Sequence, residues 1–141
     1  MSKEKILIID FGSQYNQLIA RKVREENVFC EIVPPDISVD SIDRESVKGI
    51  ILSGGPASVY QKGAPHCDRR LFDLGIPVLG ICYGMQVMAK ILGGRVGGSH
   101  SREYGRAPFT VTGQGPLFKG VPKTSVTWMS HGDKVLSLIH I

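Results

Sequence analysis

Short unbroken apolar runs alternate with amphipathic stretches over the first two thirds of the chain. The apolar runs predict four strands, over residues 5–10, 28–34, 49–56 and 76–82. Apolar positions at helical spacing predict three helices between and after them, over residues 15–27, 64–75 and 84–94. Residues 35–47 are polar and irregular, with room for a short helix. Beyond Gly94, the segments 102–112 and 125–130 predict strands in a less regular, more antiparallel region.

The predicted strands are almost continuously apolar rather than alternating between apolar and polar residues. Strands of this kind are buried on both faces, so we expect an α/β fold with an open, mostly parallel sheet and helices on both faces. Ligands of such sheets bind outside the carboxyl ends of the strands. The turns at residues 10–14, 53–58 and 82–86 are therefore the first places to look for a site.

The composition argues against nucleic-acid-binding and membrane proteins but does not indicate a particular function. The 141 residues are 42% hydrophobic and 21% charged, which is ordinary for one globular domain. The net charge of +4 comes from scattered basic residues rather than a basic stripe, so we expect no nucleic-acid partner. No apolar run is long enough to span a membrane and no secretory signal is evident, so we expect a cytoplasmic protein with no membrane partner.

The cysteines and histidines do not form a familiar metal pattern. The chain has three cysteines without a Cys-x-x-Cys pair, and four histidines without metal-binding spacing. We therefore expect no metal and no disulfide framework. Cys30 lies in an apolar run and Cys67 in a predicted helix, and both are expected to be core thiols.

Cys82 stands apart because it lies between Gly80 and Gly84 at a predicted strand-to-helix turn. The pattern Gly-x-Cys-x-Gly matches the nucleophile elbow, in which small neighbours let the strand and helix backbones approach closely. A helix starting there would direct unpaired N–H groups towards the sulfur and favour the thiolate. A core cysteine at a glycine-rich turn remains the alternative. Gly54 and Gly55 follow the neighbouring strand and could supply a second oxyanion donor, which favours acyl transfer.

Four segments together resemble the class I (triad) glutamine amidotransferases over about residues 4–136. They read ILIIDFGSQYNQLIAR, GIILSGGPASVY, GICYGMQ and VTWMSHGDKV. The resemblance implies a flavodoxin-like, three-layer domain. It also implies that Cys82 attacks the side-chain amide of glutamine, giving a glutamyl thioester and ammonia.

The resemblance assigns roles to further residues. The N–H groups of Gly55 and Tyr83 would hold the oxyanion, and Gln86 would help to bind glutamine. The glutamine pocket would also include Ser130, His131, Gly132 and Asp133. His131 as the catalytic base is the competing reading. Asp10, Ser13 and Gln14 are interpreted as structural residues or as part of an interface with another domain.

The end of the chain departs from the family pattern. The family's catalytic His and Glu belong to a later His-Pro-Glu motif, which does not occur here, and His140 is not followed by Pro-Glu. Because residues 139–141 also differ, we expect a partial domain, truncated at its end and weakly active or inactive.

The resemblance is closest to a member in which an ATP-using synthetase domain follows the glutaminase domain. It implies that domain as partner, ATP and magnesium for that domain alone, and a homodimeric parent. Two alternatives stay open: a non-catalytic or regulatory module lacking the His-Glu pair, and a cysteine hydrolase of a related α/β fold.

Overall fold

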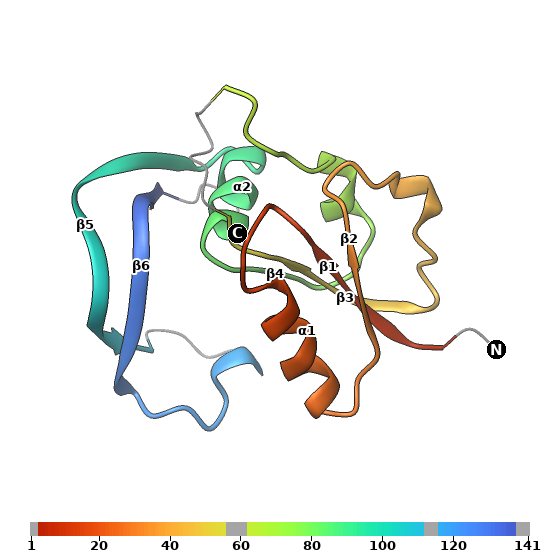
Figure 1. The fold of residues 1–141 in the computed structure, drawn as a ribbon, viewed down its shortest axis with the longest axis horizontal. Coiled ribbons are helices and arrows are strands. Elements are labelled where there is room, and N and C mark those ends of the chain that lie inside the picture. The colour runs from red at the N-terminus through yellow and green to blue at the C-terminus, as the bar shows by residue number, and fades with distance from the viewer. Residues whose placement is uncertain (1–2, 56–61, 112–115, 138–141) are drawn as a thin grey trace.

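A four-stranded parallel sheet forms the centre of the computed structural model, which describes residues 3–55, 62–111 and 116–137 (Figure 1). Its strands lie in the order β2-β1-β3-β4. Their bounds are Lys5–Ile9 for β1, Cys30–Val33 for β2, Val47–Leu52 for β3 and Val78–Gly80 for β4. All three strand pairs are parallel, as the apolar runs predict.

One face of the sheet is covered by helix α1 (Asn16–Glu25). Ile8 and Cys30 on this face pack with Ala20 of the helix, and all three are at most 1% exposed. The partly buried residues around them are Ile6, Ile19, Val23, Ile32 and Ile51. The α1 face is therefore a small, separate core.

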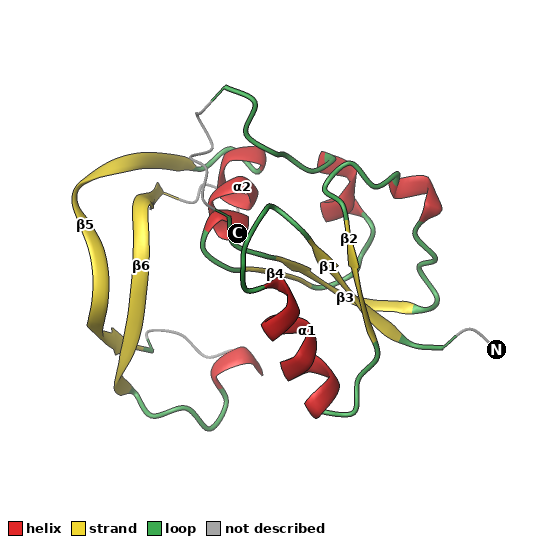
Figure 2. Cartoon of the chain, in the orientation of Figure 1, coloured by secondary structure: helices red, strands yellow, loops and turns green. Residues whose placement is uncertain are grey.

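The opposite face carries the larger core. Leu7, Ile9, Ile50 and Leu52 point to this face and pack with residues of helix α2 (Tyr83–Ile91). Two 3-10 helices complete the layer, η1 (Val39–Ser41) and η2 (Arg69–Asp73). Helices thus cover both faces of a parallel sheet, which confirms the expected α/β class (Figure 2).

A long antiparallel ribbon follows α2 and extends away from the sheet (Figure 1). It pairs β5 (Arg95–Thr110) with β6 (Thr124–Ser137), and a 3-10 helix, η3 (Pro116–Phe118), lies in the connection. Phe109 and Phe118 contact each other there, with ring centroids 5.4 Å apart. The antiparallel region is confirmed, and its strands are longer than the sequence predicts.

The predicted helix over residues 64–75 is wrong in type and length. Residues 64–68 are not helical, so Cys67 does not lie on a helix, and only the 3-10 helix η2 forms after them. The Asp68 carboxylate accepts a hydrogen bond from the Arg70 N–H at 2.9 Å and caps the N-terminus of η2, so the helical segment begins only at Arg69. Gly75, at φ +74°, then ends the segment as predicted.

Burial makes the Cys67 thiol a pH-dependent element of the core. Cys67 is 9% exposed, and burial, aided by the nearby Asp68 charge, raises its pKa from 9.0 to about 11. The folded protein holds this proton more tightly than the unfolded chain. The resulting stability is complete below pH 9 and is lost as the pH rises towards 11.

We therefore predict that Cys67→Ala flattens the alkaline loss of stability. Urea unfolding between pH 8 and 11 should show a smaller fall in the free energy of unfolding for this variant than for the wild type. Val87→Ala is the matched control, because it removes a buried side chain from the same core but no titratable group, and it should keep the wild-type slope. Parallel curves for wild type and Cys67→Ala would contradict the prediction.

Candidate active site

Cys82 occupies a strained turn between β4 and α2. Its backbone adopts φ 52° and ψ −116°, and among the described non-glycine residues only Asn27 shares a positive φ. The Gly84 N–H donates to the Ile81 carbonyl at 2.9 Å, and the Gln86 N–H donates to the Cys82 carbonyl at 3.2 Å. Strain of this kind persists only where the surroundings enforce it. It is the backbone signature expected of a nucleophile elbow.

The two flanking glycines are required by close backbone contacts. A Cβ on Gly80 would lie 2.7 Å from the Met85 Cα, inside van der Waals distance. A Cβ on Gly84 would collide with the Leu52 carbonyl at the end of β3. The first turn of α2 therefore packs directly on the ends of two strands, as the elbow pattern predicts.

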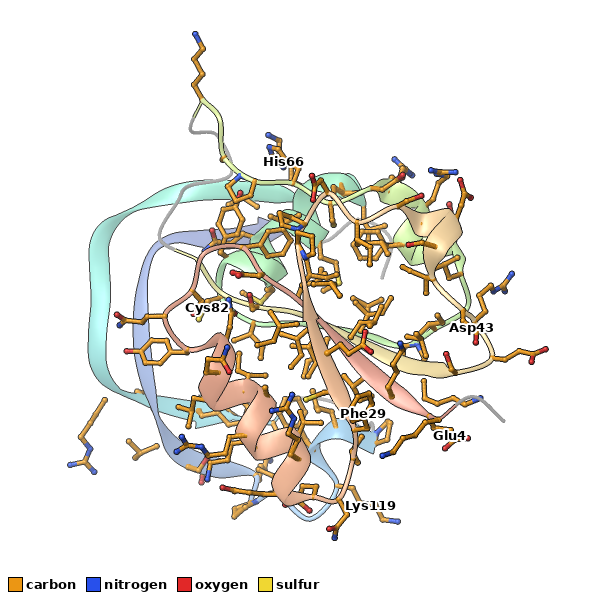
Figure 3. All side chains as sticks on the ribbon, turned by 45° about the vertical axis from the view of Figure 1, so that its right-hand side comes forward. Glu4, Phe29, Asp43, His66, Cys82 and Lys119 are labelled. Atoms are coloured by element: carbon orange, nitrogen blue, oxygen red, sulfur yellow. The ribbon has the colours of Figure 1, made fainter. Side chains whose placement is uncertain are left out.

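Cys82 opens into a cavity of about 420 Å³ at the carboxyl edge of the sheet. The residues lining it come from the ends of β1, β3 and β4: Gly12, Ser13, Gln14, Tyr15, Gly54, Gly55 and Cys82. Figure 3 shows Cys82 beside the loop that leads into α1. Cys82 is exposed, whereas Cys30 and Cys67 are buried. Of the three thiols, Cys82 alone is open to a ligand from solvent.

The glycine pair after β3 faces the cysteine. A Cβ on Gly54 would lie 3.4 Å from the Cys82 Cβ and 3.9 Å from the Ser13 Oγ. A Cβ on Gly55 would collide with the Phe11 carbonyl. The backbone of this turn is thus held between the β1–α1 loop and Cys82.

The backbone and the side chain of Tyr83 lie in different surroundings. As the first residue of α2, it has an N–H without an acceptor inside the helix. Its side chain is 2% exposed and lies edge-on to Phe11, with ring centroids 5.4 Å apart. The Tyr83 hydroxyl donates to the Pro65 carbonyl at 2.6 Å, and burial raises its pKa. The side chain therefore anchors the turn while the N–H remains beside Cys82.

The structure brings only some of the predicted site residues together. Gly55 and Cys82 line the cavity, and Tyr83 adjoins it through its backbone. Gln86 is 5% exposed on α2 and is not among the lining residues, so its substrate contact stays a prediction.

The predicted Ser130–Asp133 pocket lies on β6. Its backbone register places Ser130 opposite Tyr104, His131 opposite Glu103 and Asp133 opposite Gly98. The side chains of residues 130–133 lie outside the described part of the structure. Their contribution to a glutamine pocket, and the competing reading of His131 as a base, remain predictions.

The β1–α1 loop contributes more to the cavity than the sequence alone indicates. Ser13 and Gln14 are interpreted from the sequence as structural or interface residues, and the structure places both on the cavity wall. The structural interpretation suits Asp10, whose carboxylate accepts from the Gly12 N–H at 2.7 Å and from the Asn16 side chain. The loop follows the first parallel strand, and the sequence already marks residues 10–14 as one of the turns where a ligand would bind.

The sequence model described as "Glutamine amidotransferase class-I" matches residues 7–139. The chain belongs to this family. It is 56% identical over 135 residues to the GMP synthase [glutamine-hydrolyzing] of Caldanaerobacter subterraneus, covering 96% of this chain and 26% of that enzyme. It is 58% identical over 137 residues to that of Heliobacterium modesticaldum, covering 97% and 27%. The chain thus spans about a quarter of the length of these relatives.

Solved structures agree with the amidotransferase fold. A candidate GMP synthase subunit from Thermoplasma acidophilum is 29% identical, with a TM-score of 0.83 over 99% of this chain and 70% of its own. A glutamine amidotransferase from Thermotoga maritima is 22% identical, with a TM-score of 0.73 over 98% and 64% of the two chains. Within the described residues, no helix is long and apolar enough to cross a membrane.

The exposure of Cys82 predicts selective alkylation. Limiting iodoacetamide at neutral pH should modify Cys82 at least about tenfold faster than Cys30 or Cys67, because buried thiols are inert. Peptide mapping by mass spectrometry measures the three rates. Equal modification of all three thiols would contradict the assignment, and denaturation in urea should equalise them.

The crowding at Gly84 predicts a stability loss from a single methyl group. Gly84→Ala should lower the free energy of unfolding by about 1–3 kcal/mol through overpacking, although alanine ordinarily favours a helix. Gly54→Ala is the matched control, because its Cβ would make only an ordinary contact at 3.4 Å. Urea denaturation checks both variants, and a stabilised Gly84→Ala would contradict the predicted collision.

Proposed function

We propose that this chain is the glutaminase part of a GMP synthase. The observation that carries the proposal is the strained, exposed Cys82 facing the Gly54–Gly55 turn across a cavity. Membership of the class I glutamine amidotransferases and about 55% identity to GMP synthases support it.

The proposed reaction runs in two steps at Cys82. The thiolate attacks the side-chain carbonyl carbon of glutamine, the C–N bond breaks, and protonated nitrogen leaves as ammonia. Water then attacks the resulting γ-glutamyl thioester, releasing glutamate and regenerating the thiol. The N–H groups of Gly55 and Tyr83 stabilise the negative charge on the oxygen in both tetrahedral intermediates.

A base is needed for both proton transfers, and the family supplies it from a His-Pro-Glu motif. These 141 residues contain no such motif. A nucleophilic thiol is activated by an adjacent base, so we propose that the chain by itself hydrolyses glutamine slowly.

The activity of the whole protein is proposed from its named relatives. Ammonia from glutamine would aminate XMP to GMP in a synthetase domain that consumes ATP with magnesium, within a homodimeric parent. The chain covers 26% and 27% of these relatives, within the part that we propose acts as the glutaminase. GMP synthesis belongs to purine nucleotide biosynthesis.

The missing His-Pro-Glu motif favours one alternative, a non-catalytic or regulatory amidotransferase-like module. Such a module has no need for a strained backbone at Cys82 or for the glycine contacts around it. The two proposals differ in whether Cys82 recognises glutamine chemically.

The deciding experiment uses the glutamine-analogue electrophile 6-diazo-5-oxo-L-norleucine. We expect one covalent adduct, on Cys82, with a rate that saturates with reagent concentration and falls when L-glutamine is added. Cys82→Ala should form no adduct, and Cys67→Ala, a buried-thiol control, should react as the wild type does. Intact-protein mass spectrometry measures the adduct. Non-saturating modification that L-glutamine does not slow would favour the non-catalytic module.

A further inference from the structure

The residues that line the Cys82 cavity differ in whether they have side chains that can form hydrogen bonds with a ligand. Gly54, Gly55 and Gly12 contribute no side chains, and Cys82 contributes the thiol. Hydrogen-bonding side chains come from the β1–α1 loop, through Ser13, Gln14 and Tyr15. Gln14 and Tyr15 are exposed, Tyr15 by 57%, whereas Ser13 is half-buried and lies deeper in the cavity.

The Ser13 hydroxyl is oriented by the loop and retains a proton to donate. Its oxygen accepts a hydrogen bond from the Tyr15 N–H at 2.9 Å. A hydroxyl has one donor and two acceptor positions, so this bond leaves the O–H free to meet an acceptor on a ligand. Ser13 Oγ and Cys82 Cβ both lie within 4 Å of one point, the position of a Cβ on Gly54. The donor and the nucleophile are therefore close enough to contact one ligand.

The surroundings favour a negatively charged acceptor. The cavity borders the N-terminal ends of two helices, because Tyr15 precedes α1 and Cys82 precedes α2. Neither helix has an acidic residue in its first turn. The nearby Asp10 carboxylate is engaged by Gly12 and Asn16 and does not line the cavity. Helix N-termini attract anions.

We propose that the Ser13 hydroxyl donates a hydrogen bond to the α-carboxylate of the glutamine whose side-chain amide lies at Cys82. This inference rests on the proposed glutaminase function and adds a ligand contact to it. Ser13 then helps to distinguish an amino acid from a simple amide. The β1–α1 loop becomes part of the substrate pocket rather than only a structural turn.

The test measures how well ligands protect Cys82 from iodoacetamide, which needs no catalytic base. The two ligands are L-glutamine and L-glutaminamide, which replaces the α-carboxylate by a neutral amide. In Ser13→Ala the half-protecting concentration of L-glutamine should rise about tenfold, as expected for a lost hydrogen bond to a charged group. The value for L-glutaminamide should change little.

Two further variants keep the result interpretable. Ser13→Thr retains the hydroxyl and the local bond to Tyr15, and should protect as the wild type does. Ser41→Ala is the matched control, because Ser41 Oγ makes a comparable local bond, to the Ser38 carbonyl, outside the cavity. Rates without ligand provide the reference for each variant.

The outcomes separate the two proposals. If L-glutamine protects the wild type and Ser13→Ala equally, the Ser13 contact is wrong and the glutaminase proposal stands. If the affinity for L-glutaminamide falls as much as that for L-glutamine, the carboxylate assignment is wrong. If L-glutamine does not protect the wild type, both proposals are overturned.

Discussion

The close approach of backbones at the end of β4 is the constraint on which the candidate site depends. Strand β4 ends at Gly80 and helix α2 begins at Tyr83, so the chain reverses its course over two residues. Only a strained conformation at Cys82 allows this, and only glycine at positions 80 and 84 leaves space for it. The thiol consequently projects outward from a turn whose next residue, Tyr83, is 2% exposed.

The other cavity walls are fixed to this turn through Phe11. Its ring lies against Tyr83, its carbonyl lies against Gly55, and its N–H donates to the Ser53 Oγ at 3.3 Å. Tyr83 extends the connection to the Pro65 carbonyl. Loops that follow three different strands thus share one buried aromatic contact. A catalytic constellation benefits from such support, because its geometry is then set by the core rather than by mobile loops.

The sequence predicted those parts of the fold in which close packing requires a regular spacing of apolar residues or a glycine at a given position. Continuous apolar strands predicted a parallel sheet, and the glycines around Cys82 predicted the elbow, because both patterns follow from close packing. The start of the helical segment was mispredicted because the Asp68 side chain caps a helix that begins at Arg69, and the spacing of apolar residues does not reveal this boundary. Residues 10–14 were among the turns predicted to hold a site, but Ser13 itself was interpreted as a structural or interface residue. Its place on the cavity wall depends on how three loops meet, which no local pattern in the chain specifies.

Two cysteines of this fold lie in different surroundings, one buried and one exposed. Cys67 lies in the same buried cluster as Tyr83, and burial raises its pKa to about 11 and keeps the thiol protonated at neutral pH. Cys82 is exposed at the N-terminal end of α2, where helix N–H groups face developing negative charge. Of these two thiols, Cys82 is therefore the one that a ligand from solvent can reach, because Cys67 lies in the core.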